Sequence, residues 1–113
     1  EKDGVYVSVS HSGPWAVCVT ADVPVGVDVE VVRSAQEKFM RRVCSEQEMA
    51  YIRSGGDGDC QRFWEIWTAK EALFKLTGKG PLLALSRFSL PAGVTLDYTA
   101  QKGCALTIAA QIL

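Results

Sequence analysis

Apolar and polar residues alternate along the first part of the chain. Apolar, mostly β-branched residues dominate 5–9, 15–20 and 25–31, and short runs of this kind are typical of strands. Turn-forming residues separate the runs, at 10–14 and at 21–24. The pattern predicts three consecutive strands that pair as an antiparallel meander.

The middle of the chain carries helix signals. A serine followed by a glutamate three residues later forms a capping box at the start of a helix, and the sequence carries this signature twice. Ser34 with Glu37 opens the first predicted helix, over 34–42. Ser45 with Glu48 opens the second, which ends before a glycine-rich loop.

The longest predicted element is a helix over 60–77. Asp59 is placed to cap its first turn and Gly78 to end it. Because successive helical residues turn by about 100°, its large apolar side chains project onto one arc, which predicts a buried face. The residues of this arc are Phe63, Ile66, Trp67, Leu73 and Phe74. Lys70 projects into the same arc, so its ammonium group must either reach solvent or meet an anion.

Strand signals return in the last part of the chain, at 88–90, 94–98 and 104–112. The order of strands, helices and strands predicts an α+β fold in which three helices pack on an antiparallel sheet. Because 113 residues are enough for one hydrophobic core, we expect a single domain over 1–113.

Composition and charge narrow the class of protein. Apolar residues are 48% of the chain and charged residues 22%, which is typical of a globular chain and not of a disordered one. The net charge of −1 gives no reason to expect nucleic acid or an anionic membrane surface as partner. No apolar run approaches the length of about 18 residues that a membrane span needs.

The four cysteines are scattered and form no Cys-x-x-Cys pair. A disulfide framework or a zinc site is therefore not expected. We expect reduced thiols in a protein of the cytoplasm. The chain starts at Glu1 and not at methionine, so either its ends were trimmed or it is part of a longer protein.

Asp28 and Glu30 are the first candidates for residues of a functional site. They lie two residues apart on a predicted strand, so they share one face and are about 6.5–7 Å apart along the chain. Carboxylates this close repel each other unless a cation lies between them, and Mg²⁺ suits oxygen ligands of this kind. The alternative is an acidic pair that faces solvent, as charges on the outer face of a sheet usually do.

Two further pairs of residues are candidates. Glu71 and Lys75 are neighbours four apart on the long helix, beside the apolar arc, and their alternative is an ordinary surface ion pair. Ser10 and His11 lie in a predicted turn whose hydroxyl and amide groups could hold a phosphate. The alternative for these two is a surface turn without a ligand.

Together these segments resemble the 4′-phosphopantetheinyl transferases, in their surfactin-synthetase-activating (Sfp-like) branch. Residues 26–30 match the family's Gly-(Ile/Val)-Asp-x-Glu strand, and 67–75 match its Trp-(Ser/Thr/Cys)-x-Lys-Glu-(Ala/Ser)-x-x-Lys helix. The Ser-His-Ser of 10–12 and the Gly-Lys-Gly of 78–80 also fit. The resemblance extends from about Val7 to Ile112 and implies the fold of this family.

The resemblance also implies roles for the acidic residues. Asp28, Glu30 and Glu71 would coordinate Mg²⁺ on the pyrophosphate of coenzyme A. Glu71 would in addition be the base that deprotonates the acceptor serine, directly or through a water molecule.

The lysines and the Ser-His-Ser segment would contact the rest of coenzyme A. The resemblance implies that Lys70 and Lys75 neutralise the phosphates, with Lys70 favouring the departure of 3′,5′-ADP. Ser10 and His11 would contact the nucleotide, His11 near its 3′-phosphate.

The resemblance predicts an enzyme that transfers 4′-phosphopantetheine to a serine of an apo acyl or peptidyl carrier protein, as fatty-acid and secondary-metabolite synthesis require. Such enzymes are pseudo-dimers of two similar halves with coenzyme A between them, and this chain supplies the second half. We therefore expect a homo-oligomer or a missing N-terminal half. A non-catalytic half-domain that binds coenzyme A or a carrier is the main alternative, and a metal-dependent nuclease is a further one.

Overall fold

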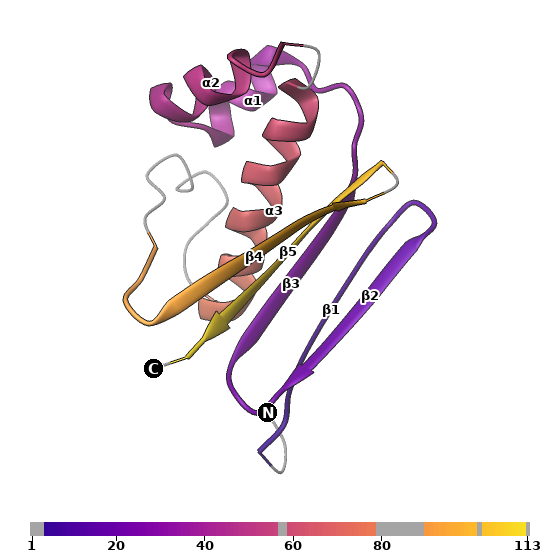
Figure 1. Cartoon of the computed structure of the whole chain (residues 1–113), viewed down its shortest axis with the longest axis vertical. Coiled ribbons are helices and arrows are strands. Elements are labelled where there is room, and N and C mark those ends of the chain that lie inside the picture. The colour runs from indigo at the N-terminus through magenta and orange to yellow at the C-terminus, as the bar shows by residue number, and fades with distance from the viewer. Residues whose placement is uncertain (1–3, 57–58, 79–89, 102, 113) are drawn as a thin grey trace.

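The elements of the computed structural model follow the predicted order of strands, helices and strands (Figure 1). The structure describes residues 4–56, 59–78, 90–101 and 103–112. In chain order the elements are β1 (Tyr6–Ser12), β2 (Trp15–Ala21), β3 (Val25–Val31), α1 (Glu37–Val43), α2 (Glu46–Arg53), α3 (Asp59–Thr77), β4 (Val94–Gln101) and β5 (Cys104–Gln111). Helices and antiparallel strands combine as the predicted α+β class. The strand predicted at 88–90 lies outside the described residues except for Leu90, which is not in a strand.

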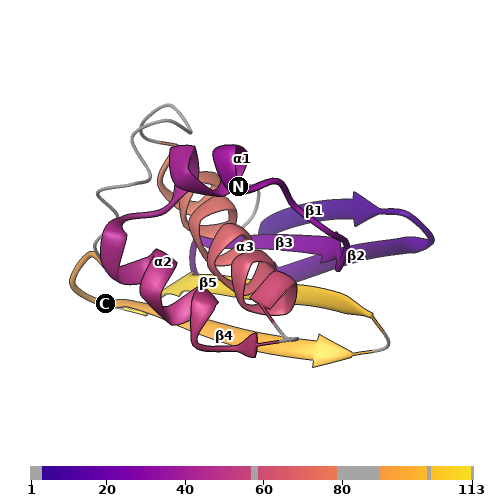
Figure 2. The same ribbon diagram turned by 90° about the horizontal axis from the view of Figure 1, so that it is seen from above.

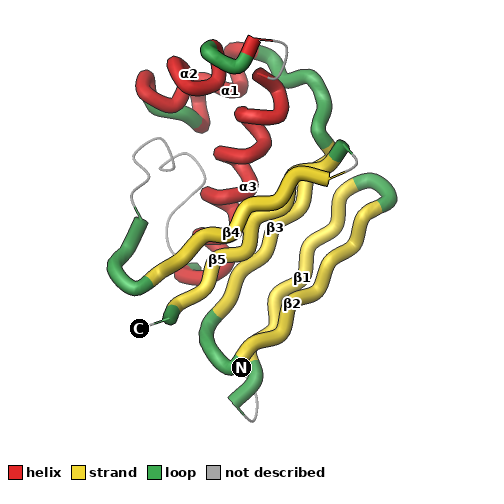
Figure 3. The backbone as a smooth tube through the Cα atoms, in the orientation of Figure 1, coloured by secondary structure: helices red, strands yellow, loops and turns green. Residues whose placement is uncertain are grey.

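The strands form two sheets and not one meander (Figure 3). β1 and β2 pair as an antiparallel hairpin, whereas the second sheet has the order β3–β5–β4 with antiparallel pairs throughout. The predicted pairing of the third strand with the second is therefore wrong. β3 takes its backbone partner, β5, from the end of the chain.

Side chains join the hairpin to β3 in place of a backbone ladder. Three backbone N–H groups of β3 donate to serine hydroxyls of β1. The bonds are Val27 to Ser8 at 3.0 Å, Val29 to Ser10 at 3.2 Å and Val31 to Ser12 at 3.0 Å. Because both partners advance by two residues each time, β1 and β3 run in the same direction. These hydroxyls accept the N–H groups that backbone carbonyl oxygens would accept in a continuous sheet.

The turn of the hairpin is shorter than predicted. Ser12 pairs with Trp15, so only Gly13 and Pro14 form the turn, and Ser10 to Ser12 belong to β1. Gly13 has φ 55°, and a glycine with positive φ at the first position of a two-residue turn is typical of hairpins with the correct twist. Ser10 and His11 consequently point to opposite faces of a strand.

The long helix α3 lies against one face of the β3–β5–β4 sheet (Figure 2). Small residues make this close approach possible: a Cβ on Gly26 would overlap the carbonyl oxygen of Ala72. Opposite Gly26 and its neighbours, β5 presents Ala105, Thr107 and Ala109, all with 0% exposure. Since side chains alternate along a strand, Asp28 and Glu30 share the face of Gly26 and are directed toward α3.

The short helices cover the first part of α3. Met40 and Val43 of α1 and Met49 and Ile52 of α2 form a core with Phe63 and Trp64. Ser45 and Glu48 form the predicted capping box, with Glu48 N–H donating to Ser45 Oγ at 3.2 Å and Ser45 N–H to Glu48 Oε1 at 2.8 Å.

Of the other predicted helix ends, one is wrong and one is confirmed. The cap predicted at Ser34 is wrong, because α1 begins at Glu37 after Gln36, whose side chain makes no cap bond. Gly78 ends α3 as predicted, with φ 65° and its N–H bonded to Phe74 O at 2.7 Å. The side chain of Asp59 lies outside the described part. No helix among the described residues has the length and apolar character needed to cross a bilayer.

Candidate functional site

Asp28 is the most buried charged group of the site, with 5% exposure. Its Oδ1 accepts a hydrogen bond from Ser10 Oγ at 3.1 Å and lies 3.8 Å from Lys75 Nζ. Its Oδ2 is buried and has no hydrogen-bond partner among the described residues. Burial, reinforced by the charge of Glu30, raises the pKa of Asp28 to about 7, although the bond from Ser10 and the charge of Lys75 oppose the shift.

Glu71 approaches the same place from α3. It is half-buried, and its Oε1 has no hydrogen-bond partner in the part of the chain that the structure describes. Burial raises the pKa of this carboxyl, the charge of Lys75 lowers it, and the charge of Glu30 raises it. Asp28 and Glu71 therefore each hold one buried oxygen atom that lacks a hydrogen-bond donor.

Glu30 differs from these two because both of its oxygen atoms have partners. Oε1 accepts from Arg33 Nη1 at 3.1 Å and from Ser12 Oγ at 3.4 Å, and Oε2 accepts from Trp67 Nε1 at 3.0 Å. Arg33 also lies over the Trp64 ring at 3.9 Å and accepts a bond from Trp64 Nε1 through its backbone carbonyl.

The partners of Glu30 were not predicted from the sequence as site residues. Arg33 lies three residues beyond Glu30, and Trp67 lies one helical turn before Glu71, a spacing that in retrospect indicates a shared face. Beside Glu30, these residues and Phe39 line a groove of about 300 Å³.

Lys75 links the site to the hairpin. Its Nζ donates to the carbonyl oxygens of Val9 at 3.0 Å and Val27 at 3.1 Å. Within the described chain its ion pair is with Asp28, and not with Glu71, which was the alternative to a role in the site. The ammonium group thus holds β1, β3 and α3 together beside the carboxylates.

The side chain of Lys70, which the sequence predicts as a phosphate ligand, is directed toward α2. Its side chain is 1% exposed, and its Nζ donates to Val43 O and to Glu48 Oε1, both at 2.7 Å. The lysine therefore meets its anion on α2, within the protein. The apolar arc predicted its direction correctly, and Glu48 is an anionic partner that the sequence did not identify. A contact of Lys70 with phosphate stays a prediction.

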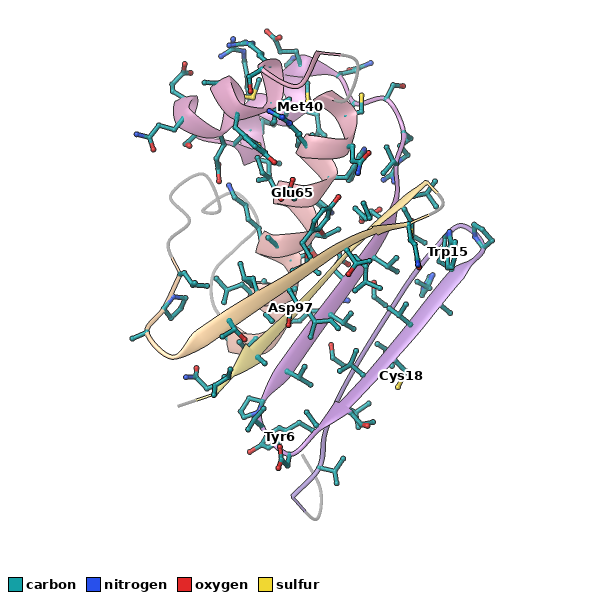
Figure 4. The ribbon with its side chains drawn as sticks, in the orientation of Figure 1. Tyr6, Trp15, Cys18, Met40, Glu65 and Asp97 are labelled. Carbon is teal, nitrogen blue, oxygen red and sulfur yellow. The ribbon has the colours of Figure 1, made fainter. Side chains whose placement is uncertain are left out.

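Ser10 and His11 separate on the two faces of β1. Ser10 is directed to β3, and its single hydroxyl proton is donated to Asp28. A contact of Ser10 with the nucleotide stays a prediction. His11 is exposed on the outer face. There it helps to line a hollow of about 330 Å³ with Val9, Ala16 and Cys18, and Cys18 points away from the main sheet (Figure 4).

The donor set fits a hard cation only in part. Among the described residues, no three acidic, histidine or cysteine side chains are arranged as a ready metal site. Asp28 Oδ2 and Glu71 Oε1 are nevertheless buried carboxylate oxygens without a partner, and Mg²⁺ in proteins is commonly held by one or two carboxylates and phosphate oxygens. These two atoms are the ones that fit such an ion.

The fold and the site together define a class of protein. It is an α+β domain in which carboxylates of a strand face a glutamate and a lysine of one helix. Side chains of these types are suited to a cation that is bound together with phosphate. Comparison with known proteins specifies the family. Residues 24–108 match the 4′-phosphopantetheinyl transferase superfamily, and the chain belongs to it, as the motifs predicted.

Three relatives illustrate the relationship. The 4′-phosphopantetheinyl transferase gsp of Aneurinibacillus migulanus is 31% identical over 74% of this chain and 36% of its own length. Sfp of Bacillus subtilis (strain 168) is 30% identical over 75% of this chain and 38% of its own length. The transferase psf-1 of Bacillus pumilus is 35% identical over 74% of this chain and 36% of its own length. The matched part is thus little more than a third of each relative.

Proposed function

We propose that this chain forms the metal-binding part of a 4′-phosphopantetheinyl transferase that acts on coenzyme A and an apo acyl or peptidyl carrier protein. The observation that carries the proposal is the pair of buried, unpartnered oxygens, Asp28 Oδ2 and Glu71 Oε1, beside Lys75. Uncompensated carboxylates of this kind are unfavourable without a cation. A magnesium ion with a pyrophosphate would satisfy both.

We assign a separate role to each residue of the site. Asp28 and Glu71 would hold Mg²⁺, with Glu30 as the third carboxylate, and Lys75 would face the phosphates. A bound magnesium ion supplies positive charge for the pyrophosphate. Glu71, whose pKa is raised, would accept the proton of the carrier serine. As it does so, the serine oxygen would form a bond to the phosphorus that carries pantetheine. The bond to the bridging oxygen breaks, and 3′,5′-ADP leaves with its electron pair.

The nucleotide would lie toward the hairpin, with His11 as its contact. Lys70 has no part in this proposal, because its ammonium group is bound to Glu48. We place the reaction in the cytoplasm, in fatty-acid or secondary-metabolite synthesis. Unpaired thiols at Cys18, Cys44, Cys60 and Cys104 fit that location.

Mg²⁺-dependent binding of coenzyme A tests the proposal. Asp28→Ala is expected to abolish the magnesium dependence, whereas Asp97→Ala, which removes an exposed carboxylate of β4 (Figure 4), is expected to leave it unchanged. Because burial raises the pKa of Asp28 to about 7, a cation competes there with a proton, so binding should strengthen as pH rises from about 6 to about 8. Calorimetry at several pH values measures both effects. Unchanged magnesium dependence in Asp28→Ala would remove this site from the proposal.

A second candidate is a half-domain that binds coenzyme A or a carrier without turnover. The match covers 36% of the length of gsp, so transfer by this chain alone is itself part of the proposal. A mass-shift assay on an apo carrier protein distinguishes the two, since only a transferase adds phosphopantetheine.

The chain is expected to self-associate or to require a further segment to complete its coenzyme A site. Val5, Val7 and Val9 on the outer face of the hairpin are 44%, 59% and 61% exposed, and a second unit that covers them would remove apolar area from water. Light scattering at micromolar concentration measures the assembly. A monomer with full transfer activity would contradict the expectation.

A further inference from the structure

The hydroxyl groups of Ser8, Ser10 and Ser12 form a row along β1 that faces β3. Each accepts a hydrogen bond from one backbone N–H of β3. In this respect the three serines are equivalent, and they hold the hairpin to the sheet.

Within the described residues, Ser10 and Ser12 each have a second hydrogen bond, which Ser8 lacks. Ser10 Oγ donates to Asp28 Oδ1 at 3.1 Å, and Ser12 Oγ donates to Glu30 Oε1 at 3.4 Å. A serine hydroxyl has one proton and two lone pairs. Because the β3 amide donates to the oxygen, the proton remains for the carboxylate.

The two connections repeat the same local pattern. Asp28 is tied through Ser10 to the amide of Val29, and Glu30 is tied through Ser12 to the amide of Val31. In each case the hydroxyl joins a carboxylate to the peptide that follows it in β3. With Oδ1 of Asp28 held in this way, its Oδ2 remains as the unpartnered atom.

We propose, on the basis of the function given above, that Ser10 and Ser12 are positioning residues that orient the Asp28 and Glu30 carboxylates for the cation. The hairpin is thereby part of the cation site although it supplies no ligand. Groups that hold metal ligands in place commonly contribute about 10–100-fold to metal affinity.

Ser8 provides the matched control. Ser8→Ala and Ser10→Ala each remove one hydroxyl that accepts a β3 amide, so they are expected to shift the urea midpoint by similar amounts. Only Ser10→Ala also removes a carboxylate partner. Ser10→Thr keeps the hydroxyl and is expected to restore whatever Ser10→Ala loses.

Two measurements on these variants decide the matter. Calorimetry with Mg²⁺ alone should show at least about tenfold weaker binding for Ser10→Ala and unchanged binding for Ser8→Ala. Carbon-13 NMR of the Asp28 carboxyl, without metal, should show a higher titration midpoint in Ser10→Ala only. Equal effects of the two alanine variants on both measurements, or no effect of Ser10→Ala, would overturn the positioning role.

The two hypotheses fail separately. If the unmodified chain binds no Mg²⁺, the proposed cation site is wrong, yet the Asp28 titration still tests the bond from Ser10. A midpoint that moves in Ser10→Ala and not in Ser8→Ala would then support only the hydrogen bond between Ser10 and Asp28, and the orienting role would fall with the cation site. If Mg²⁺ binds and Ser10→Ala leaves its affinity unchanged, the orienting role is refuted while the cation site stands.

Discussion

Glu71→Gln is expected to lower phosphopantetheine transfer by at least about 100-fold while the chain folds as before. Glutamine has nearly the same shape as glutamate, so packing beside Trp67 and β3 is kept. It lacks the negative charge that would hold the cation and the basicity that would accept the serine proton. The raised pKa of Glu71 is what a group in proton transfer near neutral pH requires.

The effect is measured as the rate at which an apo carrier protein gains the mass of phosphopantetheine. Glu65→Gln is the matched control: Glu65 lies on the same helix (Figure 4) and accepts a bond from the Tyr51 hydroxyl at 2.7 Å, which a glutamine oxygen also accepts. If Glu71→Gln retains normal rates, the base is elsewhere, with Glu30 or a water molecule as the next candidate. If the unmodified chain transfers nothing, it is either non-catalytic or requires the further segment expected above, and the comparison with Glu71→Gln is then made with that segment present.

The carboxylates of the site could be predicted because local periodicity determines their direction. Residues two apart on a strand share a face, so the Asp28 and Glu30 spacing placed both toward the same neighbour. The sequence could not show that the neighbour would be α3. That arrangement depends on Gly26 and on the small residues of β5, whose pairing with β3 is distant in the chain.

The errors have a common cause, which is that partners far apart in sequence override local signals. The third predicted strand neighbours the second in the chain, but its backbone pairs with β5. Ser34 and Ser45 carry the same capping signature, yet only Ser45 caps a helix. At Ser45 the glutamate of the box also meets Lys70, a long-range contact that supports it. Helical periodicity placed Lys70 toward the interior but could not identify that partner.

Removal of Lys70 from its pair with Glu48 is expected to lower the free energy of unfolding by about 3–5 kcal/mol, the range for a buried ion pair that loses one member. The lysine is 1% exposed and Glu48 is 23% exposed in its side chain. Lys70→Met preserves most of the volume but leaves the carbonyl of Val43 and the charge of Glu48 without this donor. Urea denaturation of the variant measures the loss.

An exposed pair on α1 is the control. Arg41 and Glu37 are 45% and 59% exposed, and Arg41→Met is expected to change stability by less than about 1 kcal/mol, as for most surface ion pairs. Adding Glu48→Gln to Lys70→Met should recover part of the loss, because glutamine still accepts the Ser45 amide and carries no charge. The same variants test the assignment of Lys70. If Lys70→Met unfolds at the normal urea concentration and instead loses coenzyme A binding, the lysine belongs to the site after all, and the buried pair does not determine its role.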